Sequence, residues 1–158
     1  MASSTRQALA SAKAALQPLL ANADLNFAAE LFAVSGAIAS SAQLRSLLSD
    51  PSAEVKAKSG AVSAVFAKSV SESVLSFVAS LVALRWSKGS DLVASLEQLG
   101  VHAVATIAAN KGNIAQVSNE VFAFQQAIEG DSELQFALAS KSASAEARTA
   151  LVTKLLAG

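Results

Sequence analysis

The stretch AAELFAVSGAIASSAQLRSLLSDPSAEVKAKSGAVSAVFA, residues 28–67, decides the fold because the chain uses it twice. Shifted by 90 positions without gaps, it falls on SNEVFAFQQAIEGDSELQFALASKSASAEARTALVTKLLA, residues 118–157. Twelve of the 40 aligned pairs are identical: Glu30/Glu120, Phe32/Phe122, Ala33/Ala123, Ala37/Ala127, Ile38/Ile128, Leu44/Leu134, Leu48/Leu138, Ser52/Ser142, Ala53/Ala143, Ala57/Ala147, Val62/Val152 and Ala67/Ala157. Since these pairs include Phe, Ile and Leu, a shared richness in Ala and Ser does not explain them. Such a repeat is typical of one supersecondary unit used twice.

The repeated unit is predicted to be helical. Apolar residues recur every three or four positions, and only two Pro and seven Gly leave little room for an all-β fold. We expect about nine helices, at residues 4–20, 24–39, 40–48, 51–66, 70–86, 91–110, 113–129, a short one opening at 131, and 144–156. The fold class is therefore all-α: a six-helix bundle over residues 1–110, then a partial second helical repeat over residues 91–158 that shares the sixth helix.

Capping residues set the expected helix boundaries. Pairs with the capping-box form are Ser4/Gln7, Ser40/Gln43 and Ser69/Glu72. Asp50-Pro51 predicts an N-cap followed by a first-turn proline, and Asp91 and Asp131 are also expected to cap helices. Gly60 lies in the middle of a predicted helix, where glycine costs about 1 kcal/mol relative to alanine. We therefore expect Gly60 to mark a close approach between helices.

Composition argues against several classes of function. The net charge is zero without a basic block, so a nucleic-acid surface is not expected. The chain has no Cys and a single His, His102, so we expect no catalytic residue, no metal site and no cofactor. The stretches without charge, such as 31–44 and 73–84, are too short for a bilayer, which needs about 20 apolar residues. No signal peptide and no membrane insertion are expected; an enzyme with a buried polar cavity holding His102 is the weakest alternative.

Two helices carry faces that a single bundle core does not easily absorb. The helix at 70–86 has one apolar stripe of Val74, Phe77, Leu81 and Leu84 and a second stripe of Leu75, Val78, Ala79 and Val82. The first helix has sides of small residues, Ala8, Ser11, Ala14 and Ala15. Small residues let another helix come close, so the two helices together predict a groove for a visiting amphipathic helix. Arg85-Trp86 fits either packing over the end of the bundle or an interface anchor.

Several motifs in order resemble a known family. Ser11-Ala12-Lys13-Ala14-Ala15-Leu16 resembles an aromatic-Ala-x-Ala-Leu/Phe motif, with Ser11 in place of the aromatic ring. The second copy contributes Gly112-Asn113-Ile114, Glu120-Val121-Phe122-Ala123-Phe124 and Leu155-Leu156-Ala157-Gly158. Together with the spacing of the first six helices, these motifs resemble the delta subunit of F-type ATP synthases, the bacterial relative of the mitochondrial oligomycin-sensitivity-conferring protein. Trp86 and Leu96-Glu97-Gln98-Leu99-Gly100-Val101 most resemble the longer bacterial type, which carries an additional helical repeat.

The resemblance implies a non-catalytic stator in the peripheral stalk of a proton-translocating complex at the cytoplasmic face of the bacterial plasma membrane. It implies that the bundle binds the amphipathic N-terminal helix of an alpha subunit, and that a C-terminal domain absent from this chain contacts the b-subunit stalk. By position, the partner-binding residues would be Ser11, Ala14, Ala15, Leu75, Val78, Ala79 and Val82. We expect the chain to be a fragment. The alternative is a general helical-repeat scaffold that binds another amphipathic peptide.

Overall fold

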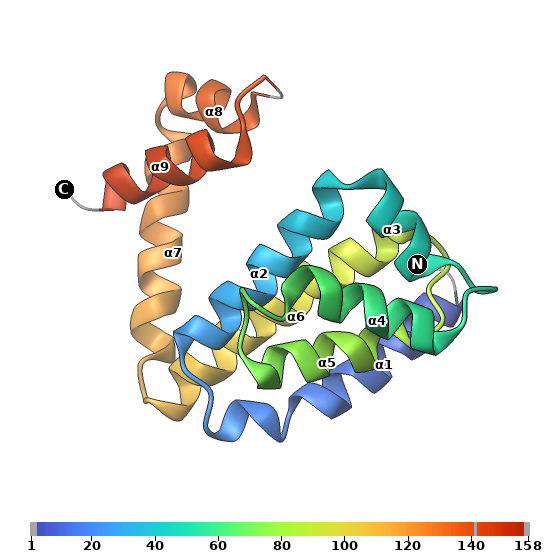
Figure 1. The fold of residues 1–158 in the computed structure, drawn as a ribbon. Coiled ribbons are helices and arrows are strands. Elements are labelled where there is room, and N and C mark those ends of the chain that lie inside the picture. Colours follow the sequence, from blue (N-terminus) through green and yellow to red (C-terminus); the bar gives the residue numbers. More distant parts are fainter. Residues whose placement is uncertain (1–2, 141, 157–158) are drawn as a thin grey trace. The chain divides into compact units, whose positions relative to one another are not determined.

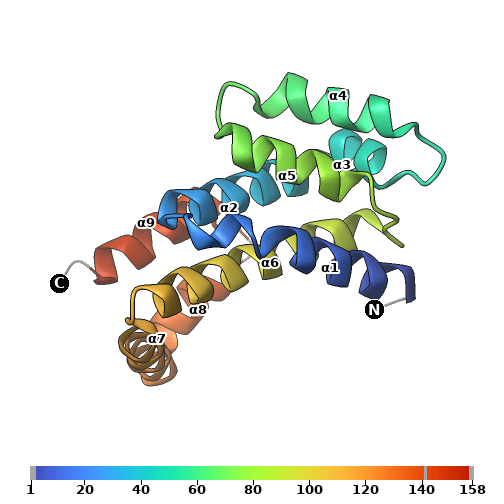
Figure 2. The ribbon, with the colours of Figure 1, turned by 90° about the horizontal axis from the view of Figure 1, so that it is seen from below.

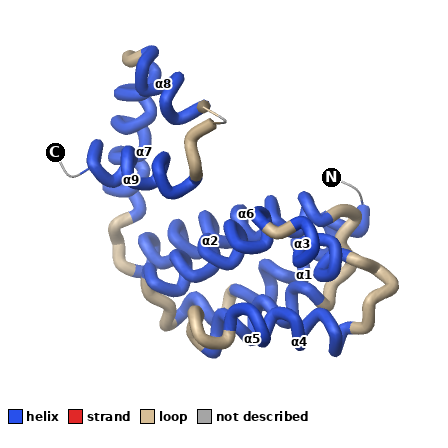
Figure 3. The backbone as a smooth tube through the Cα atoms, turned by 45° about the horizontal axis from the view of Figure 1, so that its top comes forward, coloured by secondary structure: helices blue, strands red, loops and turns tan. Residues whose placement is uncertain are grey.

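The computed structural model describes residues 3–140 and 142–156, and every regular element in that part of the chain is helical (Figures 1 and 3). The α-helices are α1 (Ser3–Leu16), α2 (Leu25–Ser40), α3 (Ala42–Ser49), α4 (Val55–Phe66), α5 (Glu72–Val82), α6 (Gly89–Asn110), α7 (Ile114–Glu129), α8 (Ser132–Ala139) and α9 (Ala145–Leu156), and a 3-10 turn, η1 (Leu19–Ala21), follows α1. The prediction of an all-α fold is confirmed.

The chain divides into two compact units, Met1–Gly112 and Asn113–Gly158. The division falls at Gly112, whose φ of 73° lies in the left-handed region that favours glycine at the end of a helix. The helix α6 belongs to the first unit in this division, so its sharing between the two repeats stays a prediction.

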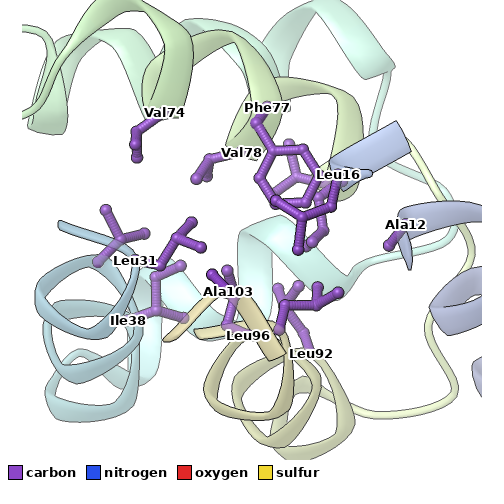
Figure 4. Packing of buried hydrophobic residues seen from close by; sticks show 14 of the residues in the cluster. Ala12, Leu16, Leu31, Ile38, Val74, Phe77, Val78, Leu92, Leu96 and Ala103 are labelled. Atoms are coloured by element: carbon purple, nitrogen blue, oxygen red, sulfur yellow. The ribbon is translucent and has the colours of Figure 1, made fainter. Parts of the chain in front are cut away.

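In the first unit, two helix pairs enclose one core (Figure 2). The helices α2 and α6 pack together, α4 packs on α5, and α1 contacts both α5 and α6. Figure 4 shows side chains from α1, α2, α5 and α6 meeting between these layers. Fully buried side chains include Leu16, Leu31, Ile38, Leu81, Leu92, Leu96 and Leu99. Each such side chain stabilises the fold by about 1.5–3 kcal/mol relative to an exposed one.

The N-caps mostly differ from those predicted. α3 is capped by Ser41, which accepts from Leu44 N at 3.2 Å, and α5 is capped by Ser71 rather than Ser69. The Asp50 carboxylate instead accepts from Ser52 N and Oγ in a turn, and α4 begins only at Val55. The cap at Asp131 is confirmed by bonds from the N–H groups of the first turn of α8. Because Ser is frequent here, several neighbouring positions can cap, and the sequence does not choose among them.

The helix α6 is long and apolar enough to cross a membrane by length and composition alone. This differs from the sequence prediction that no segment is long enough to span a bilayer. That prediction considered only stretches without any charged residue, whereas α6 contains Asp91 and Glu97 and is still apolar on average. Its Leu and Ile side chains, Leu92, Leu96, Leu99 and Ile107, are buried against other helices of the first unit, whereas Val101 is 61% exposed. The packing of a bundle core therefore accounts for its composition.

Gly60 does not mark a close approach, contrary to the prediction. It is exposed, and a Cβ built there would meet nothing within 4 Å. Close approach occurs instead at Gly89, where a Cβ would lie 2.5 Å from Cγ and 3.2 Å from the carbonyl oxygen of Arg45. The second repeat has Ala150 at the position of Gly60, which shows that this helix position accepts a methyl group.

Gly60→Ala and Gly89→Ala are expected to shift stability in opposite directions. The first gains helix propensity without a clash and stabilises by about 0.5–1 kcal/mol. The second forces α6 away from α3 and destabilises by about 1 kcal/mol or more. Urea unfolding of both variants beside the parent measures the two midpoints, and shifts of the same sign would contradict this placement of the glycines.

Candidate partner-binding groove

A groove runs between α1 and the end of α5. Its lining consists of Ser4, Gln7, Ala8 and Ser11 from α1 and of Ala83, Leu84 and Arg85 beyond α5, around a volume of 330 Å³. Figure 2 shows the two helices neighbouring one another. The α1 side of the groove has small side chains, which permits the close approach of another helix.

The three α1 residues predicted to bind a partner are all on the surface. Ser11 lines the groove, and Ala14 and Ala15 are exposed one turn further along α1. At about 100° per residue, Ala15 continues the line of Ser11, whereas Ala14 lies toward the outer edge of that line. A partner can therefore reach the whole predicted surface of α1.

The four α5 residues divide between core and surface. Val78 and Val82 are buried, with 1% and 0% of their surfaces exposed, while Leu75 and Ala79 are half-buried. Figure 4 shows Val78 pointing into the core toward Leu31. A partner therefore cannot contact Val78 or Val82 without opening the bundle. Substitution of either residue would lower the stability of the fold, so it would not report on partner binding alone.

The other apolar stripe reaches the groove only at its end. Val74, Phe77 and Leu81 are buried, and Leu84, just beyond the end of α5, lines the groove. Figure 4 shows Phe77 pointing toward Leu16 of α1. At about 100° per residue, Leu75 lies about 160° around α5 from Phe77, so it faces away from α1. The sequence shows two apolar stripes but not which neighbour covers each, and nothing in their composition singles out Leu84.

Hydrogen bonds fix the start of α1 beside the groove. The buried hydroxyl of Thr5 donates to Asp91 Oδ2 at 2.7 Å and accepts from Ser87 N at 3.3 Å. Ser4 Oγ also lies 2.6 Å from Ser87 Oγ. These bonds link α1 to the connection between α5 and α6, which holds both sides of the groove in place. Ser4 and Asp91, predicted as helix caps, are thus used for tertiary contacts.

Trp86 closes the end of the bundle. Only 3% of its surface is exposed, and its indole N–H donates to the carbonyl of Leu81 at 2.9 Å. Packing over the bundle end is therefore confirmed, and the side chain is not presented to a partner. Arg85 beside it is exposed and lines the groove.

The chemistry of the described residues is limited. His102 is half-buried on α6, and no three His, Asp or Glu side chains of the described segments come together as a metal site. The groove itself offers hydroxyl, amide, guanidinium and apolar groups, which suit the binding of a polypeptide surface better than the activation of a nucleophile.

Comparison with known proteins defines the class of this helical bundle. A model of the ATP synthase delta (OSCP) subunit family matches residues 8–98. The chain is 38% identical to ATP synthase subunit delta of Leifsonia xyli subsp. xyli over 158 residues, covering 100% of this chain and 59% of that protein. It is 35% identical to the subunits delta of Pseudarthrobacter chlorophenolicus and Streptomyces griseus, again over 100% of this chain and covering 60% and 59% of theirs.

The chain therefore belongs to the ATP synthase delta (OSCP) subunit family. It spans about three fifths of the length of these relatives. The family match covers most of the first unit, and the alignments with the relatives extend over the second.

Thr5→Val is expected to loosen α1. The change keeps the shape of the side chain but removes the hydroxyl that donates to Asp91, at a cost of about 1.5–3 kcal/mol for a bond to a charged group. Thr5→Ser is the matched control, because it keeps the hydroxyl and loses one buried methyl group, worth about 0.8 kcal/mol. Urea unfolding at pH 7 compares them; equal losses in both variants would show that the hydrogen bond does not fix the helix.

Proposed function

We propose that this chain is a non-catalytic stator and adaptor of an F-type ATP synthase peripheral stalk. In this proposal the first unit binds the amphipathic N-terminal helix of an alpha subunit and links the catalytic head to the stalk. The groove between α1 and α5, in a member of the delta subunit family, is the single observation that carries the proposal.

The shape of the groove suits a helix laid along α1. Ala8 and Ser11 allow the backbones to come close, and the half-buried Leu84 offers an apolar contact on the opposite wall. A volume of 330 Å³ accommodates a few side chains of a visiting helix rather than the whole helix. Burial of apolar surface would gain about 25 cal/mol per Å² before the costs of association are subtracted.

A stator must hold its partner without yielding under torque, so rigidity matters more than turnover. Both walls of the groove belong to the packed first unit, and the Thr5, Ser87 and Asp91 bonds fix their spacing. A groove with fixed walls loses little entropy on binding, which favours tight association. This rigidity supports an adaptor better than an enzyme that must open and close.

The remaining parts of the proposal concern the whole complex. Contact with a b-subunit stalk would use the part of the relatives that this chain does not span, and the complex would lie at the cytoplasmic face of the bacterial plasma membrane. A general scaffold for other amphipathic helices is the alternative. The exposed apolar side chains of the second unit, such as Phe122 at 62% and Phe136 at 78%, favour it.

Ala15→Asp is expected to weaken binding of a synthetic alpha-subunit N-terminal peptide at least about tenfold, because an unpaired carboxylate would be desolvated against the peptide. Ala10→Asp is the matched control: it is exposed on α1 but lies about 140° around the helix from Ala15. Calorimetric titration gives the affinities, and circular dichroism checks that both variants stay folded.

Equal binding by Ala15→Asp and the parent would show that the α1 surface is not the site. An unrelated amphipathic helix of the same length and charge provides the second comparison. If the parent chain bound it as tightly as the alpha-subunit peptide, the general scaffold would replace the stator proposal.

A further inference from the structure

A second pocket lies across the end of α5 from the groove. It has a volume of 230 Å³ and lies between the start of α4, with Val55 and Lys58, and the segment that follows α5, with Leu84 and Arg85. Leu84 and Arg85 also line the groove. The pocket therefore adjoins the proposed partner surface.

Lys58 is a buried residue whose ammonium has no bonded partner among the described residues. Only 5% of the surface of the residue is exposed, but its Nζ is not among the buried polar atoms cut off from solvent, so the ammonium reaches the pocket that Lys58 lines. The nearby Asp50 carboxylate is engaged by Ser52, whose side-chain and backbone hydrogen bonds, with a smaller contribution from the charge of Lys58, lower the pKa of Asp50. The ammonium of Lys58 therefore faces the pocket, where a further anion can pair with it.

The start of α4 adds backbone donors to the same pocket. Its N-cap residue, Glu54, makes no side-chain hydrogen bond to the free N–H groups of the first turn, although the N–H groups of Ala57 and Lys58 reach the carbonyl of Glu54. A helix start carries partial positive charge and attracts anions. Lys58 stands against that dipole, which is unfavourable for a purely structural lysine.

The internal repeat keeps a cation at this position. Arg148 is the counterpart of Lys58, and it lies at the fourth residue of α9 as Lys58 lies at the fourth residue of α4. The surrounding residues have changed, since Ala145 and Glu146 replace Val55 and Lys56. Retention of a cation near two helix starts supports a role beyond packing.

We propose that this pocket binds one carboxylate, contributed by an acidic side chain of the partner helix that lies in the adjacent groove. Lys58 and Arg85 would donate charged hydrogen bonds to it, and the uncapped start of α4 would add backbone donors. Asp50 and Glu54 nearby disfavour a multiply charged ligand such as phosphate. The identity of the partner rests on the proposed function, whereas the anion site itself does not.

Binding of the alpha-subunit peptide tests the site in the full chain. Lys58→Met keeps the apolar stem and removes the charge, Arg85→Met removes the exposed cation, and Lys56→Met is the matched control on the exposed side of the same turn. We expect each pocket variant to weaken binding about tenfold and the control to leave it unchanged. A peptide with its Glu and Asp replaced by Gln and Asn should bind the parent and Lys58→Met equally.

Retention of parent affinity by both pocket variants, or equal losses with the acidic and the amide peptide, would overturn the carboxylate assignment. If Lys58→Met does not unfold cooperatively, the affinity of Arg85→Met tests the carboxylate assignment instead. Arg85 is on the surface, so its replacement is not expected to disturb the fold.

Titration with sodium acetate separates the site from the partner. The titration is followed by the backbone amide signals of Val55 and Lys56, with sodium chloride of equal ionic strength as the control. We expect acetate to shift these signals in a saturable way and Lys58→Met to abolish the shifts. Saturation by acetate without binding of the alpha-subunit peptide would leave the anion site standing and overturn the proposed function. Saturation by phosphate but not acetate, or the same shifts in Lys58→Met, would show that the pocket is not a carboxylate site.

Discussion

The first unit depends on burial of the apolar face of α6. Leu92, Leu96 and Leu99 point into the core along this helix, and α1, α2 and α3 all pack on it. Because one helix supplies the common surface, the positions of the others are set relative to it. The Thr5 hydroxyl then fixes the start of α1 through Asp91, near the beginning of α6. The proposed groove is thus a consequence of how α1 and α5 rest on a shared core.

Much of this architecture follows from the sequence pattern. The apolar spacing identifies the helices and most of the buried residues, including Leu16 and Leu31, because amphipathic periodicity depends only on local sequence. Helix ends are less predictable. Ser41 rather than Ser40 caps α3, and Asp50 closes a turn with Ser52 instead of starting α4. Neighbouring Ser and Asp side chains compete for the same backbone donors, and tertiary contacts decide among them.

The repeat preserves sequence pattern more closely than burial. Leu31 is fully buried in α2, whereas its counterpart Val121 in α7 is 62% exposed; Phe66 is 4% exposed and its counterpart Leu156 is 68% exposed. In the first unit these positions face a core closed by α5 and α6. Among the described side chains of the second unit none is buried, since α7, α8 and α9 alone are too few to enclose a core. A shared pattern therefore predicts shared helices, while burial depends on which further helices are present.

The helix α5 shows why the site is harder to predict than the fold. Both of its apolar stripes supply buried residues, Phe77 and Leu81 from one and Val78 and Val82 from the other, while Leu84, beyond the helix end, borders the groove. Which side chain borders the groove depends on the position of α1, whose start is held by a hydrogen bond from Thr5 to Asp91, 86 residues away. Lys58 is harder still to recognise as a candidate site residue from the sequence. A lysine in the first turn of a helix is expected to be exposed to solvent, and only the structure shows that this residue is buried. In both cases a long-range contact, and not the local sequence, determines which side chains a partner can reach.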